Sequence, residues 1–451
     1  MTYIQRPVSP TVQLALYGVL LGGFLLAALW RPPVALAAML CMYGLKQWGQ
    51  SSNAWFEAHG TFTNYAIGTI VLCALTAQTI RGKCSLCNVR GSTWAVLVLY
   101  GYALFSLLWT PRPDLALDMW RLAAPYVVTA VLLTPLAMHD AQDLYRGYFA
   151  LLVFGGVLVF ALLIFAKWGD RGLLIVGGTS ELETNPLAIA NLGGAVASAA
   201  LFLRTRTLPV VSWIIRLVLV AAALALVVKS GSRGQLVATL ATVVLTLPIA
   251  FKISDVRGLV PIMIAVAVIG LAAQYAAQSY IRRDDDRWSQ RDATAAAAGR
   301  WEYSQKLLSH WAQSPGSVLF GLGNSAAFDP QIVGNYPHNV PAETLGEEGL
   351  VGLAIYLVIN GIAVSGLFRA LRATRGDPQL RRLLAVAAAN YVFTLITTLK
   401  EGNMAGSAEY FMAAILLGRM PELLAGKLPA QAPVVATAPV AVAPKFANMM
   451  R

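Results

Sequence analysis

Residues 278–311 read QSYIRRDDDRWSQRDATAAAAGRWEYSQKLLSHW, and they open a polar stretch that continues to Glu348. Long apolar segments lie on both sides of it. Of the 451 residues, 57% are hydrophobic and 12% are charged, whereas soluble domains average about 25% charged residues. The apolar runs are continuous rather than alternating, which argues against a β-barrel. We therefore predict one large aqueous loop in an all-α, polytopic membrane protein.

Thirteen apolar runs approach the length of about 20 residues that crosses a bilayer. The second run, 33–48, is short, contains Lys46 and follows the first almost without a loop. We therefore expect one of the first two runs to be irregular, which leaves about twelve transmembrane helices with both chain ends on one side. The runs are 12–30, 33–48, 62–80, 93–110, 117–137, 148–166, 187–203, 210–228, 235–252, 258–276, 349–368, 383–399 and 405–420.

Basic residues in the connections predict the orientation. Alternate connections form two sets, and the set that contains Arg81, Arg146 and Arg372 is richer in Lys and Arg. We expect this set to be cytoplasmic, where the net charge of +12 faces anionic membrane lipids. The large loop then faces the periplasm of a Gram-negative inner membrane. A cytoplasmic position also argues against a disulfide between Cys84 and Cys87.

These features divide the chain into four parts. An N-terminal bundle of transmembrane helices occupies 1–276, the periplasmic loop 277–348, and the C-terminal transmembrane helices 349–420. The remaining residues, 421–451, are rich in Ala, Pro and Val, a composition typical of a disordered tail. Within the loop, residues 300–311 have helical spacing and predict a helix that lies at the membrane surface.

Three short motifs carry residues suited to chemistry. HNVPAETLGEEGLVG at 338–352 lies where the loop returns to the membrane, KSGSRG at 229–234 is a tight turn on the same face, and GRW at 299–301 opens the loop helix. Each also has a structural interpretation: a His that caps a helix, a hairpin whose Arg reaches the interface, and an aromatic anchor. The acidic triplet at 284–286 has no further ligand beside it, so we expect no metal.

Taken together, these motifs resemble the O-antigen ligase and O-antigen polymerase superfamily. SLLWTP at 106–111 and TNPLA at 184–188 extend the resemblance, and the chain is most similar to the ligases. The resemblance implies a GT-C-like glycosyltransferase that moves a glycan from undecaprenyl pyrophosphate to an acceptor. For a ligase, the donor carries O-antigen and the acceptor is the lipid A-core oligosaccharide.

The basic residues suit a pyrophosphate leaving group. Arginine holds phosphate oxygens in a bidentate fork and keeps its charge. We expect Arg233 and Arg300 to bind the pyrophosphate, with Arg121 and Lys400 as further candidates. These cations would neutralise the leaving group in place of a metal ion, and no cofactor is expected.

His338 is the candidate base. A neutral imidazole can take the proton of an acceptor hydroxyl as the new bond forms, with inversion at the anomeric carbon. We expect Asn339 to bind substrate beside it. Glu343, Glu347 and Glu348 have two interpretations, because a carboxylate here can orient the imidazole or hydrogen-bond to backbone.

Three other functions remain as alternatives. An O-antigen polymerase and a protein O-oligosaccharyltransferase would share the superfamily and the lipid-linked donor. A transporter is less well supported, because the chain has no evident inverted repeat and few charged residues within its runs. The partners expected are the two glycolipid substrates and membrane lipids, with no nucleic acid.

Overall fold

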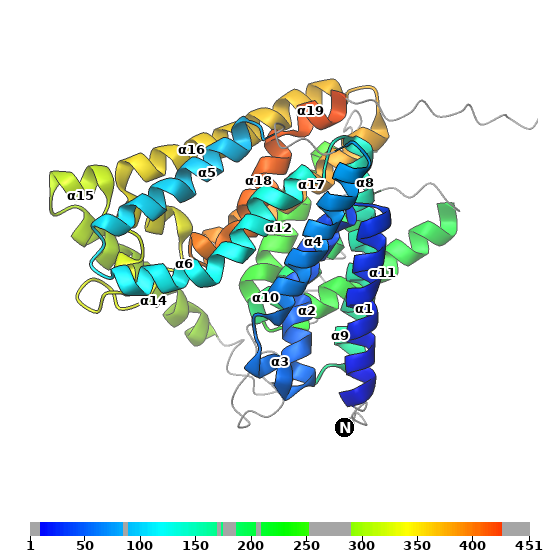
Figure 1. Ribbon diagram of the computed structural model, residues 1–451, viewed down its shortest axis with the longest axis horizontal. Coiled ribbons are helices and arrows are strands. Elements are labelled where there is room, and N and C mark those ends of the chain that lie inside the picture. Colours follow the sequence, from blue (N-terminus) through cyan, green and yellow to red (C-terminus); the bar gives the residue numbers. More distant parts are fainter. Residues whose placement is uncertain are drawn as a thin grey trace, which may run out of the picture.

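The computed structural model describes residues 10–83, 89–168, 173–174, 186–203, 209–251 and 290–425, and these form helices joined by short connections (Figure 1). Four predicted features lie outside the described residues: the apolar run at 258–276, the charge run around 284, the Cys84–Cys87 pair and the tail beyond 425.

Nine helical segments within the described ranges are long and apolar enough to cross a membrane, so the chain is a multi-pass membrane protein. The predicted all-α class is confirmed, whereas the count of about twelve is not. The segments are α1 (Pro10–Trp30), α4 (Phe62–Ile80), α5 (Gly91–Phe105) with η2 (Ser106–Leu108), α6 (Pro113–Val127) with η3 (Val128–Leu133) and α7 (Thr134–Leu136), α8 (Ala141–Ala150) with η4 (Leu151–Gly155) and α9 (Gly156–Phe165), α11 (Pro209–Lys229), α12 (Arg233–Ala250), α16 (Val340–Ala373) and α17 (Pro378–Thr398).

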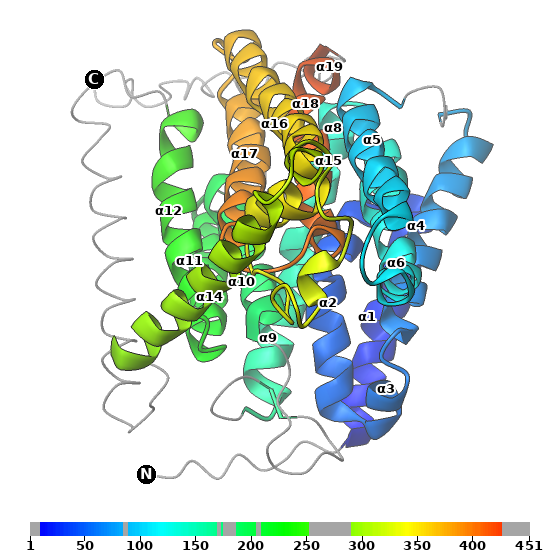
Figure 2. The ribbon, with the colours of Figure 1, turned by 90° about the vertical axis from the view of Figure 1, so that its left-hand side faces the viewer.

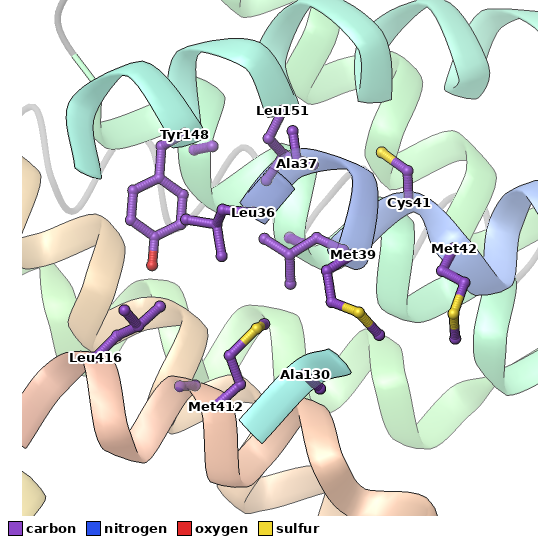
Figure 3. Packing of buried hydrophobic residues seen from close by; sticks show 14 of the residues in the cluster. Leu36, Ala37, Met39, Cys41, Met42, Ala130, Tyr148, Leu151, Met412 and Leu416 are labelled. Atoms are coloured by element: carbon purple, nitrogen blue, oxygen red, sulfur yellow. The ribbon is translucent and has the colours of Figure 1, made fainter. Parts of the chain in front are cut away.

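Three further helices fill the interior of the bundle: α2 (Val34–Ser52), α10 (Pro186–Phe202) and α18 (Ala408–Gly418). Figure 3 shows Leu36 of α2 between Tyr148 and the side chains of α18, and all of these residues are buried. Helices surrounded by protein do not need an uninterrupted apolar surface, because lipid never reaches them. α10 and α18 are apolar and match the predicted runs at 187–203 and 405–420, but they are too short to count among the nine segments. Only α2 is poorly described by its hydropathy.

α1 and α2 are two regular helices, so the prediction that one of the first two runs is irregular is wrong. Arg81, at the end of α4, donates hydrogen bonds to the carbonyls of Leu29 (2.7 Å) and Trp30 (2.9 Å). The last turn of α1 therefore lies beside Arg81, and its first turn lies at the other end of the bundle. Lys46 suggested an irregular segment, but it lies on a helix that packs inside protein.

The connections of the two sets that the structure describes lie at opposite ends of the bundle. At one end, the side chain of Arg90 lies 3.7 Å from that of Glu422 in α19 (Met420–Ala425), and Arg419 donates to the carbonyls of Pro135 and Met138. The described chain thus begins and ends at opposite ends, contrary to the expectation that both termini share one side. We call the end that carries residues 230–232 and 399–401 the site end.

The described part of the large loop lies at one side of the site end (Figures 1 and 2). α14 (Gln290–Trp311) contains the helix predicted at 300–311, and α15 (Pro315–Phe320) follows it. Both pack against α16, which begins at residue 340, before the predicted start of the span at 349. Trp301 is 66% exposed, as an aromatic anchor at a membrane surface would be.

We expect residues 290 and 375 to lie on opposite sides of the membrane. In a background without native cysteines, Gln290→Cys should react with an impermeant maleimide added to spheroplasts, because it opens the outer helix α14. Arg375→Cys, in the turn after α16, should react only after the membrane is permeabilised. Labelling of both from the same side would contradict the orientation.

Candidate functional site

His338 lies in the turn that leads into α16, with a left-handed backbone φ of +57°. Few residues with a Cβ adopt this conformation, although His does so more readily than bulky residues. The half-buried imidazole lies with its ring centroid 4.0 Å from that of Tyr336 and 6.4 Å from that of Tyr303. Strained backbone concentrates at functional sites, and here it holds one imidazole between two tyrosines.

Asn339 ties the His338 turn to a second turn. Its Oδ1 accepts a hydrogen bond from the backbone N–H of Ala342 at 2.9 Å, so Asn339 is the N-cap of α16. Its Nδ2 donates to the carbonyl of Leu399 at 3.0 Å, beside Lys400. The structural interpretation of His338 as the helix cap is therefore wrong, because Asn339 provides the cap. A substrate contact for Asn339 stays a prediction.

One face of α14 packs over these turns. Arg300, Ser304 and Leu307 share that face, because side chains three and four positions apart line up on a helix. Ser304 Oγ donates to the carbonyl of Pro337 at 3.3 Å, and Leu307 is fully buried. A Cβ at Gly346 would lie 2.5 Å from Leu307 Cγ, so this glycine permits the close approach of α14 to α16. The packing brings Arg300 to the His338 turn.

Arg300 acts on its neighbours through its charge. Burial lowers the pKa of His338 from its usual value of 6.5, and the positive charge of Arg300 lowers it further. Burial also lowers the pKa of Lys400; Glu401 opposes this shift, while Arg300 adds to it. The imidazole is therefore neutral at neutral pH, the state that a general base needs.

Lys400 is held in place by a buried polar network. Its Nζ donates to Gln235 Oε1 at 2.8 Å and to Glu401 Oε2 at 2.9 Å. Gln235 also donates to Glu401 and accepts from Ser232. Gln235 and Glu401 are both buried, and a buried charge is stable when it is paired and hydrogen-bonded in this way.

The network joins the turn before α12 to the end of α17. A Cβ at Gly234 would lie 2.6 Å from Lys400 Nζ, so the lysine side chain lies directly over this glycine. The neighbouring Arg233 opens α12 and is half-buried. The predicted tight turn is present between α11 and α12, with Gly231 at φ +72°. Arg233 and Lys400 thus belong to one end of the same bundle.

Two glutamates of the first motif hold backbone rather than His338. Glu347 accepts hydrogen bonds from the backbone N–H groups of Ser325 (2.7 Å) and Ala327 (3.0 Å). Glu343 accepts one from the backbone N–H of Met404 at 3.1 Å. Of the two interpretations of these glutamates, backbone binding is the one observed. They anchor the loop and the segment after α17 to α16.

The third glutamate joins the loop to the SLLWTP motif. Glu348 Oε1 accepts from Asn324 Nδ2 at 3.2 Å and from Ser106 Oγ at 3.3 Å. Asn324 accepts two more hydrogen bonds. Its carbonyl accepts one from Thr110 Oγ1 at 2.7 Å, and its Oδ1 accepts one from Trp120 Nε1 at 3.0 Å. Two motifs far apart in the sequence therefore meet at one asparagine, which fixes the loop against α5 and α6.

Two glycines let the loop cross α16 at very short range. Gly349 has φ +67° and ψ −166°, and Gly321 has φ +82° and ψ 175°. This backbone region is essentially restricted to glycine. A Cβ at Gly349 would lie 2.4 Å from the backbone N of Gly321, and one at Gly321 would lie 2.0 Å from the carbonyl oxygen of Glu347. The two backbones are therefore in direct contact at Gly321 and Gly349, and any side chain at either position would clash.

A known family matches the segment that carries most of this site. The model of the family described as O-Antigen ligase matches residues 217–357. This segment is an O-antigen ligase domain. No curated protein matches the sequence. The family consists of membrane enzymes of the O-antigen ligase and polymerase type, which act on lipid-linked glycans.

The O-antigen ligase domain contains Arg233, Arg300, His338 and Asn339, and the structure adds Lys400 from outside it. We call the turns at 336–339 and 399–401, together with Arg300 and the start of α12, the His338 site. Within the described residues, no three His, Cys, Asp or Glu side chains come together as metal ligands would.

Arg121 is the predicted residue that the structure does not bring to the others. It lies exposed on α6, where it forms an ion pair with Asp118 at 3.0 Å. No contact between described residues joins it to the His338 site. Arg121 was a candidate because it lies near the outer end of a predicted span. That position is weak evidence for a role in the site, because many spans end at the same face of a membrane protein.

Sequence reasoning also missed functional neighbours of the predicted residues. Gln235 and Glu401 position Lys400, and Tyr336 packs on the imidazole. A signal was present for Glu401 and Gln235, because a polar side chain one or two positions from a proposed phosphate ligand often orients it. Nothing in the sequence indicated that the two would meet.

The pH dependence of transfer should report the charge of Arg300. Because the pKa of His338 is lowered, the acid limb of kcat/KM should lie below pH 6.5, the usual value for His. Arg300→Gln should move that limb to higher pH, since one of the two causes of the lowered pKa is removed. Arg300→Lys keeps the charge and should leave the limb in place. An unchanged limb in Arg300→Gln would contradict this electrostatic role.

Proposed function

We propose that the protein is an inverting glycosyltransferase that moves O-antigen from undecaprenyl pyrophosphate to the lipid A-core oligosaccharide. Transfer takes place at the periplasmic face of the bacterial inner membrane. The observation that carries this proposal is the meeting of a neutral His338 with cations from three separate segments. The O-antigen ligase domain supports the same reaction class.

The base and the leaving-group site have separate roles in this proposal. His338 takes the proton of the acceptor hydroxyl as the hydroxyl oxygen bonds to the anomeric carbon of the donor. The bond from that carbon to the pyrophosphate oxygen breaks, and undecaprenyl pyrophosphate leaves with the electron pair. Attack from the side opposite the leaving group inverts the anomeric centre. No covalent enzyme intermediate is required.

Arg300, Lys400 and Arg233 stabilise the charge that collects on the leaving group. Guanidinium groups and an ammonium fixed before the reaction stabilise developing negative charge more effectively than water does, because they need no reorganisation. The hydrogen bonds of Lys400 to Gln235 and Glu401 supply that fixed position. Burial and the charge of Arg300 also lower the pKa of His338, so Arg300 supports both the proton transfer and the departure of the leaving group.

The acceptor distinguishes a ligase from its relatives. Purified protein with undecaprenyl-pyrophosphate-linked glycan should discharge the donor when lipid A-core is added, and should not do so with lipid A that lacks core sugars. Transfer to a second lipid-linked glycan would identify a polymerase instead, and transfer to a protein would identify an oligosaccharyltransferase. Discharge at the same rate without any acceptor would contradict all three.

A further inference from the structure

A polar cavity extends from the His338 site into the interior of the bundle. It measures about 410 Å³ and is lined by residues of α2, the end of α6, α10, α17 and the segment from residue 401 to 410. Tyr336 and Glu401 form part of its wall, so it borders both the imidazole and the lysine network. Its volume lies in the range of about 300–1,000 Å³ that small-molecule sites occupy. We call it the Asn191 cavity.

Two amide oxygens in the wall of this cavity have no hydrogen-bond partner within the described part of the chain. Asn191 Oδ1 on α10 and Gln47 Oε1 on α2 are buried and accept no hydrogen bond from any described residue. Gln47 is 5% exposed. A buried polar atom without a partner is costly, and native structures rarely keep one without a ligand, water or function. These two oxygens come from different helices and line the same space.

Two ionisable side chains also face the cavity. Lys46 of α2 and Glu409 of α18 line it, and neither has an ion-pair partner among the described residues. An ionisable residue among membrane helices indicates a functional site, because its burial is otherwise unfavourable. Glu401 in the same wall is already paired with Lys400, so Glu409 and Lys46 leave one carboxyl group and one amine to line the remaining space. A neutral polar ligand suits this wall better than a phosphate does.

We propose that the Asn191 cavity is a carbohydrate-binding compartment that takes a sugar residue of one of the two glycolipid substrates. Sugars present many hydroxyl groups, each of which can donate to an unpartnered amide oxygen or carboxylate. Tyrosine rings pack on the apolar faces of such ligands, and Tyr43, Tyr126 and Tyr336 line the cavity. The inference rests on the proposed function, because it assigns the substrate whose reacting end lies at His338.

The cavity also accounts for a motif that the His338 site does not use. Leu187 and Ala188 of the TNPLA motif line it, about one helical turn before Asn191 on α10. Apart from Tyr336, the wall residues lie outside the segment 217–357 that forms the O-antigen ligase domain. The cavity is thus assembled from the parts of the chain that surround that domain.

A double variant, Gln47→Met with Asn191→Leu, tests the proposal through binding. Both changes keep approximate side-chain size and remove an unpartnered buried oxygen, so folding should be retained. Equilibrium binding in nanodiscs is measured for four probes: undecaprenyl pyrophosphate, the same lipid with glycan attached, lipid A, and lipid A with core sugars. Loss of two hydrogen bonds should weaken one sugar-bearing probe by about tenfold or more.

The pattern of weakening identifies the source of the sugar. Weaker binding of the glycan-linked donor, with undecaprenyl pyrophosphate unaffected, assigns the cavity to the donor. Weaker binding of lipid A-core, with lipid A unaffected, assigns it to the acceptor. Glu409→Gln, which replaces the carboxyl group with an amide of the same shape, should weaken the same probe. Wild-type affinity for both sugar-bearing probes, or equal weakening with and without sugar, would overturn the proposal.

A matched control and a second variant separate this test from the proposed function. Ser198→Ala removes another unpartnered buried oxygen from α10, two turns from Asn191 and outside the cavity wall, and should bind all four probes normally. Arg300→Gln should weaken both undecaprenyl lipids alike, whether or not they carry sugar. If wild-type protein binds neither undecaprenyl lipid, the proposed function fails, which is a different result from a cavity variant with wild-type affinities.

Discussion

His338→Asn should lower the rate of glycan transfer by roughly 100-fold or more, the range that a positioned general base contributes. Asparagine tolerates left-handed backbone, so the φ of +57° at this position should be kept while the imidazole is lost. The measurement is kcat for transfer by purified protein, with membrane yield and melting temperature recorded beside it. Both should stay near those of the wild type.

A chemical rescue separates a base from a structural residue at this position. His338→Gly removes the imidazole and relieves the backbone strain, and added imidazole should restore part of the lost rate. His310→Asn, on the half-buried part of α14 outside the His338 site, is the control and should transfer at the wild-type rate. Wild-type transfer by His338→Asn would remove His338 from the mechanism.

Gly349→Ala should destabilise the protein by about 3 kcal/mol or more, since it combines backbone strain with overpacking. The new Cβ would lie 2.4 Å from the carbonyl oxygen of Leu319 and from the backbone N of Gly321. Neither backbone atom can move without releasing the loop that Glu347 and Glu348 hold. We therefore expect a lower melting temperature in detergent and little transfer activity.

Gly361→Ala is the matched control on the same helix. Nothing lies within 4 Å of a Cβ at Gly361, so the change should be tolerated and should leave transfer unchanged. The temperature at which half of the protein aggregates, measured for both variants, compares the two positions directly. Equal thermal stability of Gly349→Ala and wild type would contradict the prediction, because it would show that the loop leaves room for a Cβ at Gly349.

Much of the helical pattern was predictable from the sequence, because lipid-facing helices must be apolar over their whole length. The run predicted at 62–80 coincides with α4, and the turn at 229–234 joins α11 to α12. Among the interior helices, α10 and α18 also match the runs predicted at 187–203 and 405–420, whereas one of the first two runs was expected to be irregular and α2 is a regular helix. α2 carries Lys46 because one side of it faces a polar cavity, and that cavity exists only once α10, α17 and α18 have packed around it.

The candidate site was predictable in its residue types rather than in its connections. Arg300 and His338 were expected to meet a phosphate and a hydroxyl, and the structure brings them close together. The roles of Glu343, Glu347 and Glu348 depended on which backbone N–H groups come near them, which no local pattern encodes. The family match at 217–357 covers the residues that were predicted best. Apart from Tyr336, it does not include the residues that line the cavity, which come together only when the helices pack.

The two hydrogen bonds of Asn339 have a consequence for motion. One side-chain amide binds the first turn of α16 and the carbonyl of Leu399, directly after α17, so the turns that carry His338 and Lys400 should move together. Arg300 lies on α14, a separate helix that contacts the His338 turn through Ser304 and Tyr303. A change in the packing of α14 on α16 would therefore move the Arg300 guanidinium relative to two turns whose own spacing stays fixed.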